Sequence, residues 1–253
     1  MLPRSSFVEE LARLLPAPAP GTACTFIAID GVDGAGKTTL ADNLAEIMRP
    51  ARAVVRISID GFHRPRAARH ARGRDSPEGF WLDSYDYAAF WREVVVPFRS
   101  GTGTYLAAVH DVDSDALVSA PRLPVIAGAT VITDGIFLHR DELRDVWDTT
   151  VFLDVPATES VRRLALRDGS SPDPLHTSQR RYVEGQRLYL TACSPRERAS
   201  ILVDYSDIAA ASIVRGSRGA DRVGPLASRR ASAPDQSCGG DDGNRTRTIS
   251  LED

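Results

Sequence analysis

The sequence predicts an α/β fold in which helices cover a doubly wound, mainly parallel sheet of five strands. Two observations carry this prediction. Short apolar runs of β-strand character alternate with helical patterns over residues 22–215. A glycine-rich turn also follows the first of these runs and leads directly into a helical pattern. In open sheets of this kind, ligands bind beyond the carboxyl ends of the strands.

The chain divides into three parts. In residues 1–21, Phe7 and Leu11 belong to a short amphipathic helix that is followed by a Pro/Ala-rich linker. Residues 22–215 form the α/β domain. From residue 216 to residue 253, Gly, Ser, Arg, Asp and Pro dominate and no apolar periodicity remains. We therefore expect residues 216–253 to be a disordered tail.

The elements of the domain follow in order along the chain. The five predicted strands cover residues 26–29, 53–59, 131–135, 150–155 and 201–203. The helix after the first strand places Leu40, Leu44 and Ile47 on one face. An aromatic segment over residues 76–98 has helical spacing and predicts core packing. Residues 101–124 predict a small hairpin insertion.

The glycine-rich turn matches the phosphate-binding pattern G-x-x-x-x-G-K-[ST] of P-loop NTPase-type folds, in the strand-then-helix context that this pattern requires. Its glycines let backbone N–H groups approach an anion, and the helix that follows directs its positive end at the same anion. Lys37 is expected along the β- and γ-phosphates of ATP, and the Thr38 hydroxyl is expected to ligate Mg²⁺. The residues predicted to bind the nucleotide are Gly31, Asp33, Gly34, Ala35, Gly36, Lys37, Thr38 and Thr39.

Two carboxylates stand at the ends of later predicted strands. Asp60 follows the second strand, where it can accept the proton of a substrate hydroxyl, hold a metal-bound water, or do both. The alternative is that Asp60 caps a turn before Gly61, but a phosphate loop and a strand in front of it favour the catalytic role. Asp134 ends the third strand, and an acid in this position helps to hold Mg²⁺.

A predicted lid covers about residues 167–180. The helix before it carries Arg163 and Arg167, and a flexible segment rich in Gly, Ser and Pro follows Asp168. Arginines at the base of a lid can stabilise charge on a transferred phosphoryl group, so we expect this role of Arg167 first and of Arg163 second.

Residues 22–215 resemble the uridine/cytidine kinase family, within the wider phosphoribulokinase and pantothenate kinase group. The matching segments, in chain order, are the phosphate loop at 31–38, Ser-Ile-Asp-Gly-Phe-His at 58–63, Tyr-Asp at 85–86, Asp-Gly-Ile at 134–136 and Arg-Arg-Leu-Ala-Leu-Arg-Asp at 162–168. The resemblance implies transfer of phosphate from ATP to the 5′-hydroxyl of uridine or cytidine. Its implied substrate-binding residues are Asp60, His63, Tyr85, Asp86, Tyr105 and His110.

The sequence departs from the family pattern at three places. His63 stands where Tyr is usual, Asp134 replaces Glu, and the segment after Asp168 is poor in basic residues. The phosphate loop also looks like that of thymidylate kinases. A phosphate acceptor brings its own anion and needs arginine more than a base, whereas an alcohol needs a carboxylate such as Asp60. Asp60 therefore favours a small-molecule alcohol as the acceptor. The alternatives to a nucleoside are pantothenate or a sugar, which are alcohols, and thymidylate, which is a phosphate acceptor.

Composition limits the other function classes. The formal charge of −3 gives no reason to expect a nucleic-acid or acidic-membrane partner. No apolar run approaches the ~20 residues that span a bilayer. The three cysteines (Cys24, Cys193 and Cys238) are widely spaced, so they predict neither a disulfide framework nor a zinc site, and the expected compartment is a reducing cytoplasm. A homo-oligomer is compatible with the sequence, and a nucleotide-gated switch is the alternative to a metabolic enzyme.

Overall fold

The structure is a computed structural model that describes residues 4–216, all of which belong to one compact unit. The strands of its main sheet are β1 (Cys24–Gly31), β2 (Val54–Ser58), β7 (Ala129–Gly135), β8 (Thr149–Asp154), β9 (Ile201–Asp204) and β10 (Ser212–Gly216). Its α-helices are α1 (Arg4–Leu14), α2 (Lys37–Met48), α3 (Arg66–Arg69), α4 (Pro77–Asp83), α5 (Tyr87–Phe90), α6 (Val96–Ser100), α7 (Ala157–Asp168), α8 (Thr177–Cys193) and α9 (Pro195–Arg198).

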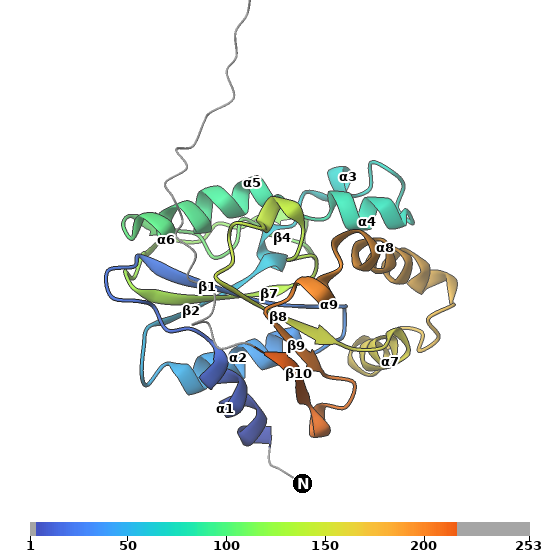
Figure 1. Cartoon of the computed structure of the whole chain (residues 1–253). Coiled ribbons are helices and arrows are strands. Elements are labelled where there is room, and N and C mark those ends of the chain that lie inside the picture. Colours follow the sequence, from blue (N-terminus) through green and yellow to red (C-terminus); the bar gives the residue numbers. More distant parts are fainter. Residues whose placement is uncertain (1–3, 217–253) are drawn as a thin grey trace, which may run out of the picture. The chain divides into compact units, whose positions relative to one another are not determined.

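The main sheet has six strands in the order β10-β9-β8-β1-β7-β2 (Figure 1). All neighbours are parallel except β10, which pairs antiparallel with β9. Because β1 lies between β7 and β8, the strand order reverses beside it, and a crevice opens there at the carboxyl ends of the strands. The predicted α/β fold with a mainly parallel sheet is confirmed.

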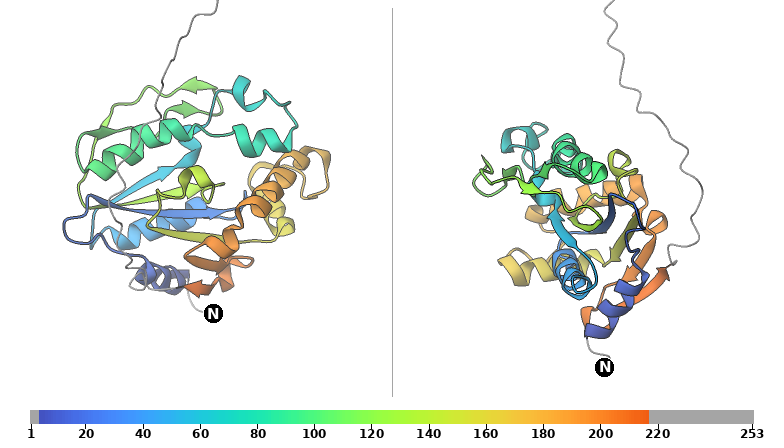
Figure 2. Two further views of the ribbon diagram at one scale, coloured as in Figure 1. Left: turned by 45° about the horizontal axis from the view of Figure 1, so that its top comes forward. Right: turned by 90° about the vertical axis from the view of Figure 1, so that its left-hand side faces the viewer.

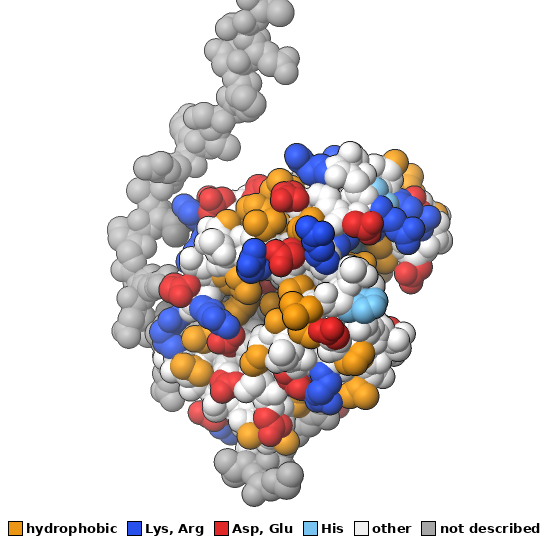
Figure 3. All heavy atoms as spheres, turned by 90° about the vertical axis from the view of Figure 1, so that its right-hand side faces the viewer, with side chains coloured by type: hydrophobic (Ala, Val, Ile, Leu, Met, Phe, Trp, Pro, Cys, Tyr) orange, Lys and Arg blue, Asp and Glu red, His pale blue; other side chains and the backbone are white. Residues whose placement is uncertain are grey.

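Helices cover both faces of the sheet. α1 and α2 lie on one face, and α5 and α6 lie on the other (Figures 1 and 2). α7 and α8 form a helical pair at the side, joined by residues 169–176. The face that carries this pair mixes basic, acidic and apolar side chains (Figure 3).

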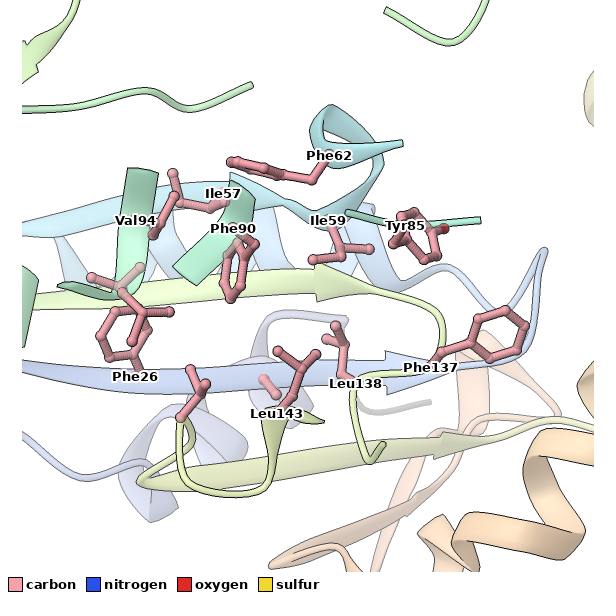
Figure 4. Close-up of a cluster of buried hydrophobic side chains, with 14 of the residues drawn as sticks. Phe26, Ile57, Ile59, Phe62, Tyr85, Phe90, Val94, Phe137, Leu138 and Leu143 are labelled. Atoms are coloured by element: carbon pink, nitrogen blue, oxygen red, sulfur yellow. The ribbon is translucent and has the colours of Figure 1, made fainter. Parts of the chain in front are cut away.

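The side chains of β1 point alternately to the two faces of the sheet and so contribute to two separate cores. Phe26 and Ala28 belong to the core beneath α5 and α6, whereas Ile27 and Ile29 belong to the core that α1 and α2 cover. Figure 4 shows the first of these cores, where Phe90 lies over the sheet, between Phe26 of β1 and Ile59 beyond the end of β2. Since all eight residues of β1 are buried, the loop that follows this strand starts from a rigid support.

An insertion follows α6 and carries the predicted hairpin. β3 (Thr104–Tyr105) pairs antiparallel with β6 (Leu123–Pro124), and between them β4 (His110–Asp111) pairs with β5 (Ala116–Leu117). The predicted small hairpin is thus present, and a second hairpin, which the sequence analysis did not predict, lies within it.

The structure corrects two details of the sequence-based expectations. The main sheet has a sixth strand, β10, which extends the ordered domain to Gly216. The buried face of α2 is formed by Leu40, Ala41, Leu44, Ala45 and Met48, while Ile47 is 38 % exposed. The tail expected over 216–253 lies outside the described residues, apart from Gly216. Within residues 4–216, no helix combines the length and the apolar character needed to cross a membrane.

Candidate active site

The phosphate loop connects β1 to α2 in a conformation that requires glycine. Gly34 and Gly36 have φ angles of +69° and +90°, in the left-handed region that other residues rarely adopt. A Cβ atom on Gly34 would lie 2.6 Å from the backbone oxygen of Ser160, so this position also has no room for a side chain. α2 begins at Lys37, which means that the unpaired amides of its first turn face the loop.

The side chain of Lys37 folds back across the loop. Its Nζ donates a hydrogen bond to the backbone oxygen of Val32 at 2.8 Å, and the residue is 9 % exposed. The ammonium group is therefore held over the cradle formed by the loop. A cation in this place can approach the β- and γ-phosphates of a bound triphosphate.

Thr38 and Asp134 are in direct contact although 96 residues separate them. The Thr38 hydroxyl donates to Asp134 Oδ2 at 2.6 Å, and Arg56 Nη2 donates to Asp134 Oδ1 at 2.8 Å. Arg56 lies on β2 beside β7, so adjacent strands supply both the carboxylate and the guanidinium that orients it. The sequence analysis did not single out Arg56, because a lone arginine within a strand carries no motif.

This pair fits a magnesium ion. Hydroxyl and carboxylate oxygens are the ligands that Mg²⁺ prefers, and Mg²⁺ is usually held by one or two carboxylates together with substrate phosphates. Within the described residues no group of three or more His, Cys, Asp or Glu side chains could hold a metal alone. Thr38 and Asp134 could therefore hold Mg²⁺ only together with the phosphates of a nucleotide.

Asp60 lies in the 3-10 turn η1 (Ile59–Phe62), directly beyond the end of β2. It is exposed, and its Oδ1 accepts a hydrogen bond from the Tyr85 hydroxyl at 2.8 Å. Burial, followed by the nearby Asp60 charge, raises the pKa of Tyr85 well above its usual value, so the tyrosine remains a donor. In the part of the chain that the structure describes, Asp60 Oδ2 accepts no hydrogen bond and is available to a substrate.

One cavity joins these groups. It measures ≈ 510 Å³ and opens at the carboxyl ends of β1, β2 and β7. Its polar lining combines residues of the phosphate loop, the two strand-end carboxylates and two arginines of α7, namely Asp33, Gly34, Gly36, Lys37, Thr38, Thr39, Asp60, Asp134, Arg163 and Arg167. The cavity thus brings the predicted general base to the predicted phosphate cradle.

Asp33 is an acidic residue within the phosphate loop itself. Its backbone N–H donates to Gln186 Oε1 on α8 at 2.7 Å, and the Ser160 hydroxyl donates to its backbone oxygen. Burial raises the pKa of the Asp33 carboxyl; Lys37 opposes the rise and Asp60 adds to it. The sequence analysis missed Gln186, since a glutamine on a helix has no recognisable spacing.

The two lid arginines have different surroundings. Arg163 is 11 % exposed and donates to the backbone oxygens of Tyr205 and Ser206 at 2.8 Å, as well as to Glu159. Arg167, one turn later on α7, is 70 % exposed, and among residues 4–216 it pairs only with its neighbour Asp168 at 3.2 Å. Arg163 therefore holds the loop after β9 in place, whereas Arg167 is free to move within the cavity.

The residues predicted to bind the acceptor are only partly brought together. His63 stacks near Tyr85, with ring centroids 4.5 Å apart, and its Nδ1 lies 2.7 Å from the Asp60 backbone oxygen. Asp86 instead accepts a hydrogen bond from Ala89 N and caps α5. None of these three side chains lines the cavity itself.

The last two predicted acceptor residues lie in the insertion. Tyr105 is 7 % exposed and packs against Phe98 at 4.8 Å, as a core residue does. His110 is 4 % exposed, and its Nε2 lies 3.2 Å from Asp115 Oδ1. Both side chains thus support the insertion, and neither lines the cavity.

No family model matches the chain. Among solved structures it is similar to a possible uridine kinase from Bacillus stearothermophilus, with a TM-score of 0.60 and 21 % identity over 78 % of this chain and 97 % of that one. A candidate fructose transport system kinase from Silicibacter sp. TM1040 gives a TM-score of 0.58 and 21 % identity over 76 % and 96 % of the two chains. A phosphoribulokinase from Rhodobacter spheroides gives 0.50 and 15 % identity over 74 % of each chain. The chain therefore has the α/β fold of these solved P-loop kinases.

Proposed function

We propose that this chain transfers the γ-phosphoryl group of ATP to the 5′-hydroxyl of a pyrimidine nucleoside, uridine or cytidine. One observation carries the phosphotransfer part of the proposal: Asp60 lines the same cavity as Lys37, Thr38 and Asp134. A switch protein needs the nucleotide cradle but has no use for an exposed carboxylate facing it. A kinase that acts on an alcohol needs both.

Each residue has a distinct task in the proposed reaction. Asp60 Oδ2 accepts the proton of the substrate hydroxyl, while the Tyr85 hydroxyl fixes the carboxylate through Oδ1. Lys37 holds the β- and γ-phosphates, and Arg167 moves against the transferred group. The chemistry that Mg²⁺ supplies when held by Thr38, Asp134 and the phosphates is neutralisation of charge on the phosphate oxygens. Positioning and electrostatics together account for most of the rate gain in such reactions.

The nucleoside part of the proposal has separate support. The segments at 58–63 and 162–168 resemble those of uridine/cytidine kinases, and the possible uridine kinase named above has the same fold. His63 is partly exposed beside Asp60 and packs on the buried Tyr85 ring, so its imidazole is a flat surface next to the proposed base on which a sugar or base could rest. We expect a small-molecule alcohol as the only substrate besides ATP, with no nucleic-acid or membrane partner. A cytoplasmic location and a homo-oligomer remain expectations.

A coupled assay of ADP release tests the proposal. Purified chain with ATP and Mg²⁺ is offered uridine, cytidine, pantothenate, fructose or thymidylate in parallel reactions. We expect ADP release above the acceptor-free rate with uridine or cytidine only. Release with pantothenate or fructose alone would keep the alcohol kinase but exclude the nucleoside. Release with thymidylate alone, or the same slow release in every reaction, would exclude an alcohol kinase altogether.

A further inference from the structure

A buried carboxylate directly precedes the phosphate loop and takes no part in the reaction proposed above. Asp30, near the end of β1, is 0 % exposed. Its Oδ1 accepts a hydrogen bond from Gly31 N at 2.7 Å. Its Oδ2 accepts from His139 N at 3.2 Å, lies 2.6 Å from His139 Nδ1, and accepts from the Tyr189 hydroxyl. Four donors thus converge on one carboxylate, which is what a buried charge requires.

The three side chains come from three separate elements. Asp30 is on β1, His139 is in the turn after β7, and Tyr189 is on α8. The turn is itself constrained, because Phe137 has a φ angle of +65° and its ring packs against that of Tyr189 at 5.0 Å. A bulky residue keeps such a conformation only where its surroundings enforce it. The carboxylate therefore ties α8 and this turn to the start of the phosphate loop.

α8 also reaches the middle of the loop. Gln186, three residues before Tyr189 on the same helix face, accepts a hydrogen bond from Asp33 N and directs its Nε2 towards the Asp33 carboxylate at 3.4 Å. The helix that returns from the predicted lid is thereby attached to the loop at Asp30 and at Asp33. The core around β1 does not depend on these two attachments, because β1 is already buried between β7 and β8.

A catalytic role for His139 does not fit its surroundings. Its Nε2 is buried without a hydrogen-bond partner, and its ring lies 6.1 Å from that of Phe152. The residue is 5 % exposed and does not line the cavity. The neutral tautomer that carries its proton on Nδ1 satisfies Asp30, and it leaves only an acceptor unpaired at Nε2. His139 is therefore a donor that points at Asp30 and is remote from any substrate.

We propose that Asp30, His139 and Tyr189 are positioning residues that fix the phosphate loop in its nucleotide-binding conformation by attaching it to α8. The inference rests on the proposed function only in assuming that the loop binds a nucleotide. It assigns no substrate contact to any of the three residues. The hydrogen bond from Gly31 N to Asp30 carries the effect into the loop backbone, where the phosphates bind.

Substituting Tyr189 with Phe tests this inference, because it removes one donor and keeps the ring that packs on Phe137. Tyr87→Phe is the matched control: the Tyr87 hydroxyl is also buried but makes no hydrogen bond. The readouts are the Kd of a fluorescent ATP analogue and amide hydrogen exchange in residues 31–36. Because hydrogen bonds to charged groups are strong, we expect Tyr189→Phe to weaken nucleotide binding about 5- to 10-fold and to speed exchange in the loop. We expect Tyr87→Phe to change neither.

A second pair of variants separates positioning from packing. The side-chain amide of Asn can replace the Nδ1 donor of His139, whereas Leu cannot. We expect His139→Asn to bind the analogue within about threefold of the wild type, and His139→Leu to lose about tenfold. Wild-type affinity in both Tyr189→Phe and His139→Leu, or equal losses in the Asn and Leu variants, would overturn the inference. If Tyr189→Phe does not fold, the comparison of Asn with Leu decides.

The readouts also keep this inference distinct from the proposed function. Nucleotide binding is measured without any acceptor, so a wrong acceptor leaves the test intact. A wild-type chain that binds no nucleotide would reject the proposed function itself. A wild-type chain that binds nucleotide as tightly as its Tyr189→Phe and His139→Leu variants would reject only the positioning role.

Discussion

The two halves of the cavity are built in different ways. On the donor side, Lys37 and Thr38 are held by hydrogen bonds to Val32 and Asp134, on a loop whose backbone is fixed by glycine conformation and by α8. On the acceptor side, Asp60 is exposed, and among the described residues only the Tyr85 hydroxyl donates a hydrogen bond to its carboxylate. The donor side is therefore held by several contacts, whereas the acceptor side presents one exposed carboxylate with a single donor.

This difference indicates how the protein divides its tasks. Triphosphate binding depends on backbone N–H groups and a helix end, which need a rigid loop. The further residues predicted to recognise the acceptor lie between His63 and His110, and several of these have local structural contacts instead. Closure of α7 and the segment after it would complete the acceptor side, in the way that lids commonly assemble a site upon binding.

The largest expected effect is on the donor side. Lys37→Ala removes the cation that the loop holds over the phosphates, so we expect kcat to fall by about 10³-fold. The melting temperature should change little, because within the described part of the chain the Lys37 side chain makes a single hydrogen bond, to Val32. Steady-state ADP release and a thermal melt check this prediction. Turnover within tenfold of the wild type would show that the preformed cradle is not where the reaction takes place.

The next effect tests the acceptor side. Asp60→Asn keeps the shape of the side chain and removes the base, so we expect kcat to fall by about 10²-fold with nucleotide Kd unchanged. Separate measurement of kcat and of nucleotide binding distinguishes the two halves of the cavity. If turnover stays within a few fold, the assignment of Asp60 as the base is wrong.

The two arginines of α7 should respond in opposite ways. Arg167→Ala is expected to lower kcat about tenfold without affecting stability, because Arg167 is exposed and pairs only with Asp168. Arg163→Ala is expected to lower the free energy of unfolding by about 1–3 kcal/mol, because it leaves the backbone oxygens of Tyr205 and Ser206 without their donor. Thermal or urea unfolding, together with turnover, checks both. A reversed pattern would make Arg163 the residue that acts on the phosphoryl group.

The smallest expected effect concerns Asp86. Asn caps a helix as well as Asp does, so Asp86→Asn should keep turnover within about twofold if the carboxylate serves only α5. Asp86→Ala should cost about 1 kcal/mol of stability, through loss of the cap to Ala89. Measured KM values for the acceptor provide the check. A large rise in KM with Asn would restore the predicted contact between Asp86 and the ribose.

The sequence predicted the parts of the fold that depend on continuous apolar runs. β1, β7 and β8 are buried along most of their length, and each of the five parallel strands contains a run of apolar residues that marks it in the sequence. β10 was missed because it is an edge strand in which four of the five residues are exposed, so it has no buried apolar run. Ile47 was placed on the wrong face because the small residues Ala41 and Ala45 pack closely and give only a weak periodic signal.

Residues of the candidate site could be singled out where chemistry fixes the spacing. The phosphate loop needs its residues at fixed positions, so the motif singled out Lys37 and Thr38, and the strand-end rule singled out Asp134. The structure brings these residues to one cavity, and their roles stay predictions. Asp86 shows the limit of this reasoning. A carboxylate before a helix can bind a ligand or cap the helix, and both roles have the same sequence pattern. Asp30 and Tyr189 lie 159 residues apart, and no pattern along the chain indicates that they meet.

The anchoring of the Lys37 amine over the loop has a practical consequence. The chain contains thirty arginines, and Lys37 is its only lysine. Any reagent that acylates or reductively alkylates ε-amines can therefore label the folded protein at a single side chain, apart from its amino terminus. Occupancy of the cradle could be followed by mass spectrometry as protection of that one amine, without a substrate having been identified.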